Sequence, residues 1–203
     1  MYKERRIMEF IIKETGKRVT VECRNERQDG CAEDVAINCG LDISLRDDEE
    51  NAYVVSQEDA DWWVEFFQTL NVCAEEIEGL EKKYSGEEIR EILNDEMGEF
   101  DIDYYEEAIK RTADILQKRY NTENARLVSS YESDLSSSEF SYVKESLYQR
   151  DDGSYFLAGE GGEMTRYSQM DGCDGCTYGE GSYSITAAEA QEWLAEHHDK
   201  VSR

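Results

Sequence analysis

The spacing of apolar residues changes near residue 56, and this change most constrains how the chain folds. Before that point, residues 7–13 and 18–23 have the two-residue alternation of strands, which predicts two strands joined into a hairpin by a turn over residues 14–17. After that point, apolar residues recur every three or four positions, which predicts a long amphipathic helix. The helical series is Trp63, Phe66, Phe67, Leu70, Cys73, Ile77, Leu80 and Tyr84.

Two further helices are predicted in the middle of the chain, one ending at Gly98 and the other at Asn121. Because the connections between the three helices are short, we expect them to form one layer that packs on the N-terminal sheet. Ser56 is the predicted N-cap of the first of them. Short apolar runs predict three more strands, at residues 35–37, 41–45 and 52–55.

The C-terminal third predicts short strands and one terminal helix. Thr186 is the expected N-cap of that helix, and Glu189 stands at the capping-box position. The predicted strands are residues 142–149, 154–158 and 183–185, and the helix covers residues 187–198. Gly159, Gly161 and Gly162 do not have the spacing of a phosphate-binding loop and are interpreted as a turn between strands.

These patterns together predict an α+β chain with two domains. Residues 1–128 form an acidic α+β domain, an N-terminal antiparallel sheet with a three-helix layer. Residues 129–139 are rich in serine, which is typical of a linker. Residues 140–203 form a small antiparallel β segment that ends in a C-terminal helix.

The charge balance limits the partners that the chain can have. It carries 48 acidic and 22 basic side chains, a formal net charge of −26. Because phosphate contacts need Lys and Arg, this balance excludes direct nucleic-acid binding by the bulk surface. Thirteen Tyr, six Phe and three Trp argue against a disordered acidic chain. The sequence has no apolar run of membrane-helix length and no signal peptide, so we expect a cytoplasmic protein with reduced cysteines and no membrane contact.

Acidic residues concentrate between positions 75 and 107, where 14 acids stand against three bases. Within this block a carboxylate recurs every four residues, which gives one stripe with axial steps of about 6 Å along a helix. Such a stripe can imitate successive phosphates of a nucleic-acid strand; the alternative is an ordinary solvated face. The stripe consists of Glu87, Glu91, Asp95 and Glu99.

The run of residues 47–50 is a second acidic candidate. Four adjacent carboxylates on a loop can enter a cluster of Arg side chains in a partner. The alternatives are an exposed loop or a weak cation site, because the run lacks the pattern of a calcium loop. The predicted partner-binding residues are therefore Asp47, Asp48, Glu49, Glu50, Glu87, Glu88, Glu91, Asp95, Glu96 and Glu99.

Metal and catalytic chemistry find little support in the sequence. Cys173 and Cys176 have a C-x-x-C spacing, but tetrahedral zinc needs two more ligands, so free thiols are favoured over a metal or a redox pair. We expect no metal and no cofactor. The sequence has two His, adjacent to each other, and no nucleophile motif, so we expect a protein that is not an enzyme.

Two resemblances bear on function. The segments YQRDDGSYFLAGEGGEMTRY (148–167) and ITAAEAQEWL (185–194) resemble a small module of uncharacterised proteins from Gram-positive gut bacteria and their mobile elements, to which no activity is attached. The whole chain, acidic and rich in aromatic residues, is similar to the anti-CRISPR proteins and antirestriction DNA mimics of phages and mobile elements.

The second resemblance implies an inhibitor that blocks a host nuclease in the cytoplasm of the bacterial cell. Its partner is then a basic nucleic-acid-binding protein, a type II CRISPR (Cas9) effector first of all, whose DNA/RNA channel is lined by Lys and Arg. Trp62 and Tyr104 are candidate hot spots of that contact. The alternatives are an acidic interaction protein, such as an antitoxin or an adaptor that covers a basic partner, and a halophilic protein whose acidity serves hydration.

Overall fold

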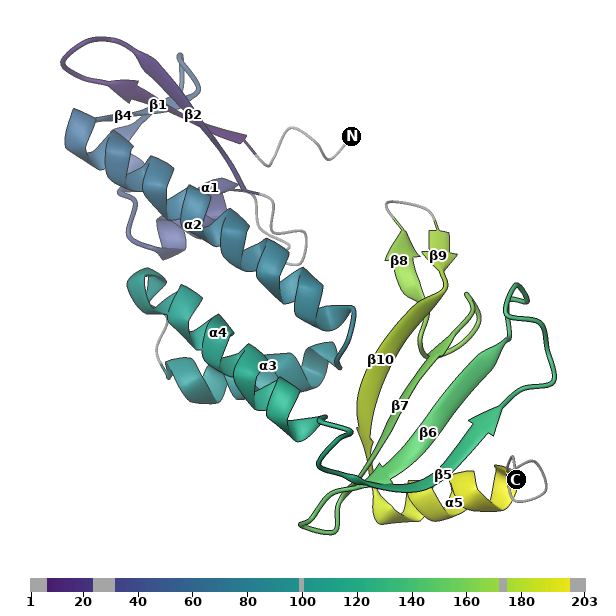
Figure 1. Cartoon of the computed structure of the whole chain (residues 1–203). Helices are drawn as coiled ribbons and strands as arrows, with labels where there is room; N and C mark the ends of the chain where they lie inside the picture. Colours follow the sequence, from purple (N-terminus) through teal and green to yellow (C-terminus); the bar gives the residue numbers. More distant parts are fainter. Residues whose placement is uncertain (1–6, 24–31, 99–100, 172–174, 198–203) are drawn as a thin grey trace. The chain divides into compact units, whose positions relative to one another are not determined.

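The computed structural model describes residues 7–23, 32–98, 101–171 and 175–197, with the side chains of 170 and 171 left aside. The chain forms two compact units (Figure 1). The first comprises Met1–Glu76 and Phe100–Glu106, and the second comprises Ile77–Glu99 and Glu107–Arg203. The fold is mixed α+β, as the sequence predicted, with a four-stranded sheet in each unit. Among the described residues, no helix combines the length and the apolar character needed to cross a bilayer.

The sheet of the first unit has the strand order β2-β1-β4-β3. The predicted hairpin is confirmed, since β1 and β2 pair antiparallel, but β1 and β4 run parallel, with Phe10 opposite Tyr53. A parallel pair needs a long connection, and residues 13–51 lie between these two strands. Strand patterns alone do not reveal this pairing. The strands are β1 (Ile7–Ile12), β2 (Arg18–Glu22), β3 (Arg46–Asp47) and β4 (Ala52–Val55).

The connection between β1 and β4 contains a helix where the sequence predicted strands. Residues Ala32–Asn38 form helix α1, and Ile43–Leu45 form the 3-10 helix η2, so the strands predicted at 35–37 and 41–45 are wrong. Ala32, Val35 and Ala36 are the buried positions of α1, and their spacing is helical. Three residues, 35–37, are too few to distinguish a helical from a strand-like spacing. The helical spacing becomes visible only when Ala32 is included.

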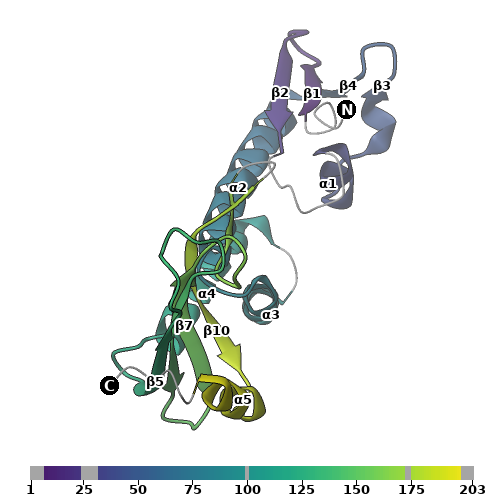
Figure 2. The same cartoon turned by 90° about the vertical axis from the view of Figure 1, so that its right-hand side faces the viewer.

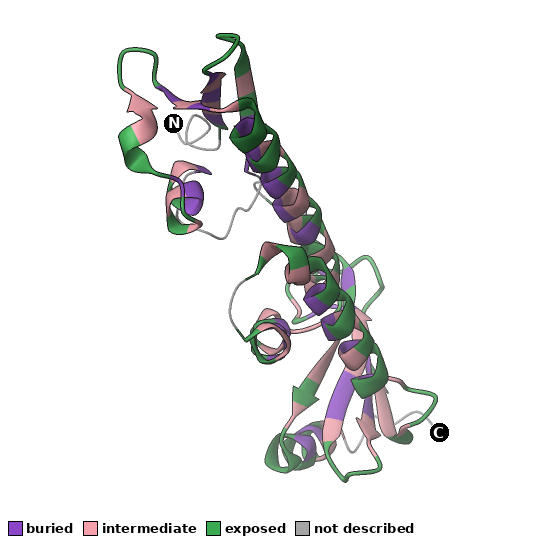
Figure 3. Cartoon of the chain, turned by 90° about the vertical axis from the view of Figure 1, so that its left-hand side faces the viewer, coloured by how far each residue is buried: buried purple, intermediate pink, exposed green. Residues whose placement is uncertain are grey.

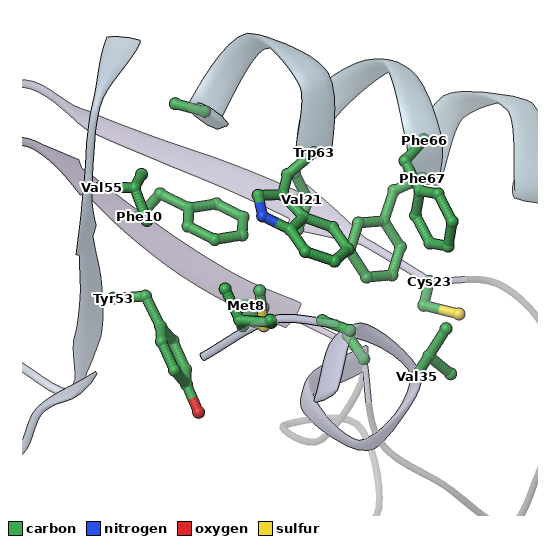
Figure 4. Close-up of a cluster of buried hydrophobic side chains, with 14 of the residues drawn as sticks. Met8, Phe10, Val21, Cys23, Val35, Tyr53, Val55, Trp63, Phe66 and Phe67 are labelled. Atoms are coloured by element: carbon green, nitrogen blue, oxygen red, sulfur yellow. The ribbon is translucent and has the colours of Figure 1, made fainter. Parts of the chain in front are cut away.

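Helix α2 (Gln57–Glu81) confirms the long amphipathic helix and covers the first sheet. Phe10, from β1, stacks on Trp63 with ring centroids 6.2 Å apart (Figure 4). The buried residues of α2 follow one side of the helix (Figure 3). Its N-cap is confirmed as well, because the Asp59 amide donates to Ser56 Oγ at 3.1 Å.

The other two predicted helices are α3 (Gly86–Met97) and α4 (Ile102–Arg119). The start of α4 packs on the core of the first unit through Ile102 and Tyr105. In the second unit, Ile89 of α3 and Leu116 of α4 share a buried cluster with Phe156 of the second sheet. The helical layer therefore divides between the two sheets rather than covering the N-terminal sheet alone.

The sheet of the second unit is antiparallel throughout, in the order β10-β7-β6-β5. Helix α5 (Ala187–His197) lies against this sheet (Figure 2). Its Trp193 packs with Leu157, which alternates with Phe156 and so lies on the opposite face of β7. The predicted capping box is present, with Thr186 N donating to Glu189 Oε2 at 2.7 Å. The strands are β5 (Arg126–Glu132), β6 (Val143–Gln149), β7 (Tyr155–Gly161) and β10 (Gly179–Ile185), with the additional hairpin β8 (Gln169–Asp171) and β9 (Gly175–Thr177).

Two composition-based predictions change in this unit. The proposed linker 129–139 begins inside β5, where Ser130 Oγ lies 2.8 Å from Ser146 Oγ of β6. Ser129 and Ser130 occupy strand positions that pair with β6, which composition does not show. Gly159 and Gly161 lie within β7 rather than in a turn, and a Cβ on Gly159 would stand 2.4 Å from the Lys144 carbonyl oxygen.

Candidate partner-binding surface

Helix α3 sorts its side chains into a buried and an exposed face. Ile89, Ile92 and Leu93 are buried, and three of the predicted carboxylates, Glu87, Glu91 and Asp95, are exposed. None of these carboxylates has an ion pair with a residue that the structure describes. We call them the α3 stripe: Glu87, Glu91 and Asp95.

The α3 stripe is an unfavourable arrangement for an isolated helix. Like charges four residues apart repel each other by a few tenths of a kcal/mol per pair. The last turn of α3 has no basic residue, so Asp95 also faces the negative end of the helix dipole without compensation. Glu87 lies in the first turn, where the helix dipole favours a carboxylate, but helix stability does not explain Glu91 and Asp95.

Two other acids of α3 hold the helix in place instead of facing solvent. Glu88 forms an ion pair with Arg119 and accepts a hydrogen bond from the Tyr120 hydroxyl. Glu96 Oε2 lies 3.8 Å from Arg111 Nη1. Burial, together with the Glu88 carboxylate, raises the pKa of Tyr120 to about 12.

The predicted stripe is also shorter than its spacing indicated. Helix α3 ends at Met97, and Gly98 follows with φ of 64°, a left-handed conformation that suits glycine at a helix end. Glu99 lies outside the described residues. The structure thus leaves three of the six predicted α3 residues on one exposed face.

The loop over residues 47–50 uses most of its carboxylates within the fold. Asp47 Oδ1 accepts hydrogen bonds from the amides of Glu49 and Glu50, at 3.0 and 3.1 Å. Asp48 Oδ1 accepts from Arg46 Nε at 3.0 Å, and the Glu50 carboxylate pairs with Arg18. Among the described residues, only the Glu49 carboxylate of this run has no partner.

Arg46 fixes this loop through several contacts. Its guanidinium pairs with Glu33 and donates to Asn51 Oδ1 at 2.9 Å, and Asn51 has φ of 52°. The Tyr53 hydroxyl donates to the same Glu33 carboxylate at 2.6 Å. Burial and this hydrogen bond raise the pKa of Tyr53. The loop is therefore a constrained turn with a partly neutralised charge.

The two predicted aromatic hot spots differ in exposure. Trp62 is 46% exposed on α2, stacked on Phe66 at a centroid distance of 5.2 Å. Glu58 and Glu65, four residues before and three after it, share its side of the helix and are exposed. Tyr104 is half-buried. Trp62 therefore has the features of an anchor: a rigid exposed ring surrounded by acids.

The cysteine pair does not assemble a metal site in the described part of the chain. Cys176 is an exposed free thiol in β9, and Cys173 lies outside the described residues. Within the described ranges, no three His, Cys, Asp or Glu side chains are grouped closely enough to hold a metal ion.

A buried carboxylate in the second unit was not anticipated from the sequence. Glu145 of β6 accepts hydrogen bonds from the Tyr167 hydroxyl and from Trp193 Nε1, each at 2.6 Å. Burial and the Glu145 carboxylate raise the pKa of Tyr167. The sequence did contain one signal for the burial of Glu145: it lies two residues before Leu147, which is buried on the same face of β6. Glu145 thereby fastens α5 and the β7–β8 loop to the sheet.

Comparisons with known proteins identified no relative of this chain. A scan against protein-family models, a search of curated proteins and a search of solved structures found no match.

Proposed function

We propose that this protein inhibits a nuclease by imitating the charge of nucleic acid and covering its basic channel. A type II CRISPR effector of the Cas9 kind is the first target to test. The observation that carries the proposal is the α3 stripe, whose three carboxylates are exposed at helical spacing and form no ion pair with a residue in the described part of the chain. Such a surface costs helix stability, and a basic partner would offset that cost.

The net charge of −26 supports the same proposal. A strongly negative protein meets a positive channel faster than a neutral one, because opposite fields steer the encounter. Effector channels hold a heteroduplex through Lys and Arg contacts to its backbone, and carboxylates can take the place of those phosphates. Trp62 adds an apolar contact of the kind that dominates binding energy at interfaces.

The experiment is a cleavage assay with a type II effector, in which the protein is added either before or after the target DNA. We expect inhibition when the protein is added first, and weaker inhibition as the salt concentration rises. The variant Glu87→Gln/Glu91→Gln/Asp95→Asn should inhibit at least tenfold less well, since several charge contacts are lost together. Order of addition identifies the blocked step.

A matched control removes the same charge elsewhere. Asp151→Asn/Glu192→Gln/Glu196→Gln also neutralises three exposed carboxylates, on the β6–β7 turn and on α5. This control should inhibit like the unmodified protein. An equal loss of inhibition in both variants would show that inhibition depends on the net charge and not on the α3 stripe. Absence of inhibition across several effectors and restriction enzymes would overturn the proposal and favour an acidic cover for another basic partner.

A further inference from the structure

A second surface of the chain combines exposed apolar side chains with uncompensated acids, and α3 has no part in it. Two loops of the second unit, β5–β6 and β7–β8, meet through a hydrogen bond from Met164 N to the Phe140 carbonyl oxygen at 2.8 Å. Phe140 is 59% exposed and Met164 is 76% exposed. These loops and the residue after β9 supply four of the nine exposed large apolar side chains in the described residues: Leu135, Phe140, Met164 and Tyr178.

Strand pairing places charged residues in one row beside these loops. Glu180 of β10 pairs with Glu160 of β7, Glu160 pairs with Lys144 of β6, and Lys144 pairs with Glu132 of β5. Directly paired residues share a face of the sheet, so all four strands contribute to the row. We call it the cross-strand row: Glu132, Lys144, Glu160 and Glu180.

The cross-strand row is not electrically balanced. Lys144 is its one base, and its Nζ lies 3.8 Å from Glu132 Oε2. Glu160 and Glu180 are like charges in directly opposed positions, an arrangement that destabilises a sheet. The row therefore has room for at least one more positive group.

Two tyrosines connect the row to the apolar loops. The Tyr142 hydroxyl donates to Glu132 Oε1 at 3.0 Å. Burial, together with the neighbouring Glu160 carboxylate, raises the pKa of Tyr178 to about 12. The two rings stack at a centroid distance of 6.4 Å, with Tyr142 buried and Tyr178 41% exposed. Tyr178 thus presents a ring face beside the carboxylate of Glu160, which is the environment that a guanidinium prefers.

We propose that this face of the second sheet docks an arginine-bearing segment of a partner protein. Arginine side chains would pair with the cross-strand row and stack on Tyr178, while apolar side chains of the segment would cover Phe140 and Met164. Charge complementarity selects this occupant, because the face offers three carboxylates against one Lys. A metal ion does not fit, since the described residues hold no group of three ligands. The proposal is independent of the α3 stripe.

The test uses a labelled nine-residue peptide of alternating Arg and Leu, with fluorescence anisotropy as the readout. Two matched peptides replace Arg by Lys, or Leu by Ala. We expect the Arg–Leu peptide to bind the full chain at least threefold more tightly than either one, because only Arg stacks well and only Leu covers the apolar loops. Amide NMR shifts on binding should concentrate in β7, β10 and the two loops.

Protein variants separate this surface from the α3 stripe. Glu132→Gln/Glu160→Gln/Glu180→Gln should weaken binding of the Arg–Leu peptide about tenfold, since each exposed ion pair contributes modestly. Tyr178→Leu should abolish the preference for Arg over Lys. The variant Glu87→Gln/Glu91→Gln/Asp95→Asn, with the same change of charge, should keep both the preference and the location of the NMR shifts. Equal binding of all three peptides, or shifts centred on α3, would overturn the proposal.

Discussion

The loop over residues 47–50 and the exposed side of α3 are both runs of carboxylates, but the fold uses them differently. In the loop, Asp47, Asp48 and Glu50 accept hydrogen bonds from backbone amides or from arginine side chains. The α3 stripe accepts none from the described residues. Density of acids in a sequence is therefore a poor guide to available charge. A nearby arginine or a tight turn decides whether a carboxylate is bonded within the fold or stays exposed.

The largest effect is expected inside α3 itself, between two neighbouring glutamates. Glu88→Ala should lower the free energy of unfolding by about 2–3 kcal/mol, because it removes the acceptor of Arg119 and Tyr120 from a nearly buried site. Glu87→Ala should change it by less than about 0.5 kcal/mol. Urea unfolding measures both values. Similar values for the two variants would show that α3 does not divide its acids as described.

The hydrogen bond from Tyr120 to Glu88 should make the stability of the fold depend on pH in the alkaline range. The pKa of Tyr120 is raised to about 12, so the folded chain keeps this proton at pH values where the unfolded chain loses it. The raised pKa contributes its full stabilisation below pH 10. The free energy of unfolding then falls by about 2 kcal/mol as the pH rises from 10 to 12. Tyr120→Phe should reduce this slope, at a cost of about 1 kcal/mol at pH 7. Identical slopes above pH 10 would contradict the assignment.

Neutralising the two acidic regions should shift stability in opposite directions. Glu87→Gln/Glu91→Gln/Asp95→Asn should raise the free energy of unfolding by about 0.5 kcal/mol at low salt, because the removed repulsion and the unfavourable dipole contact of Asp95 outweigh the lost favourable dipole contact of Glu87. Asp47→Asn/Asp48→Asn/Glu50→Gln should lower it by about 1 kcal/mol, since it weakens charged hydrogen bonds. Thermal unfolding at two salt concentrations tests both signs. A gain for the loop variant would remove the distinction between the regions.

The smallest effect concerns one exposed contact of the loop. A double-mutant cycle on Arg46→Ala and Asp48→Ala should give a coupling energy of about 0.5 kcal/mol, because the Asp48 side chain is 90% exposed. The same cycle on Arg46 and Glu33 should give a larger value, since both side chains are about two-thirds covered. Denaturant unfolding of the variants supplies both numbers, and the reverse order would contradict the described role of Arg46.

The sequence predicted correctly those features of the fold that depend on residues close together in the chain. The α2 series, the Ser56 and Thr186 caps and the end of α3 at Gly98 follow from residues at most a few positions apart. The parallel pairing of β1 with β4 and the inclusion of residue 130 in a strand depend on distant partners. The sequence had no local signal for either.

The candidate partner-binding surface was likewise predictable only where it depends on local spacing. Spacing alone placed Glu87, Glu91 and Asp95 on one face of a helix, and the structure agrees. It could not show that Glu88 turns toward Arg119, a residue 31 positions away. The cross-strand row was equally hidden, because its four members come from four strands whose register is set by pairing.

Helices α2 and α4 each supply residues to both compact units, and this sharing restricts how the gene can be rearranged. The chain passes between the units at residues 76/77, 99/100 and 106/107, so no single recombination breakpoint separates them. A fragment that starts at residue 140 would leave behind β5 and the side chains of α3 and α4 that cover Phe156. Recombination should therefore transfer this coding sequence whole, and hybrids joined inside it should misfold.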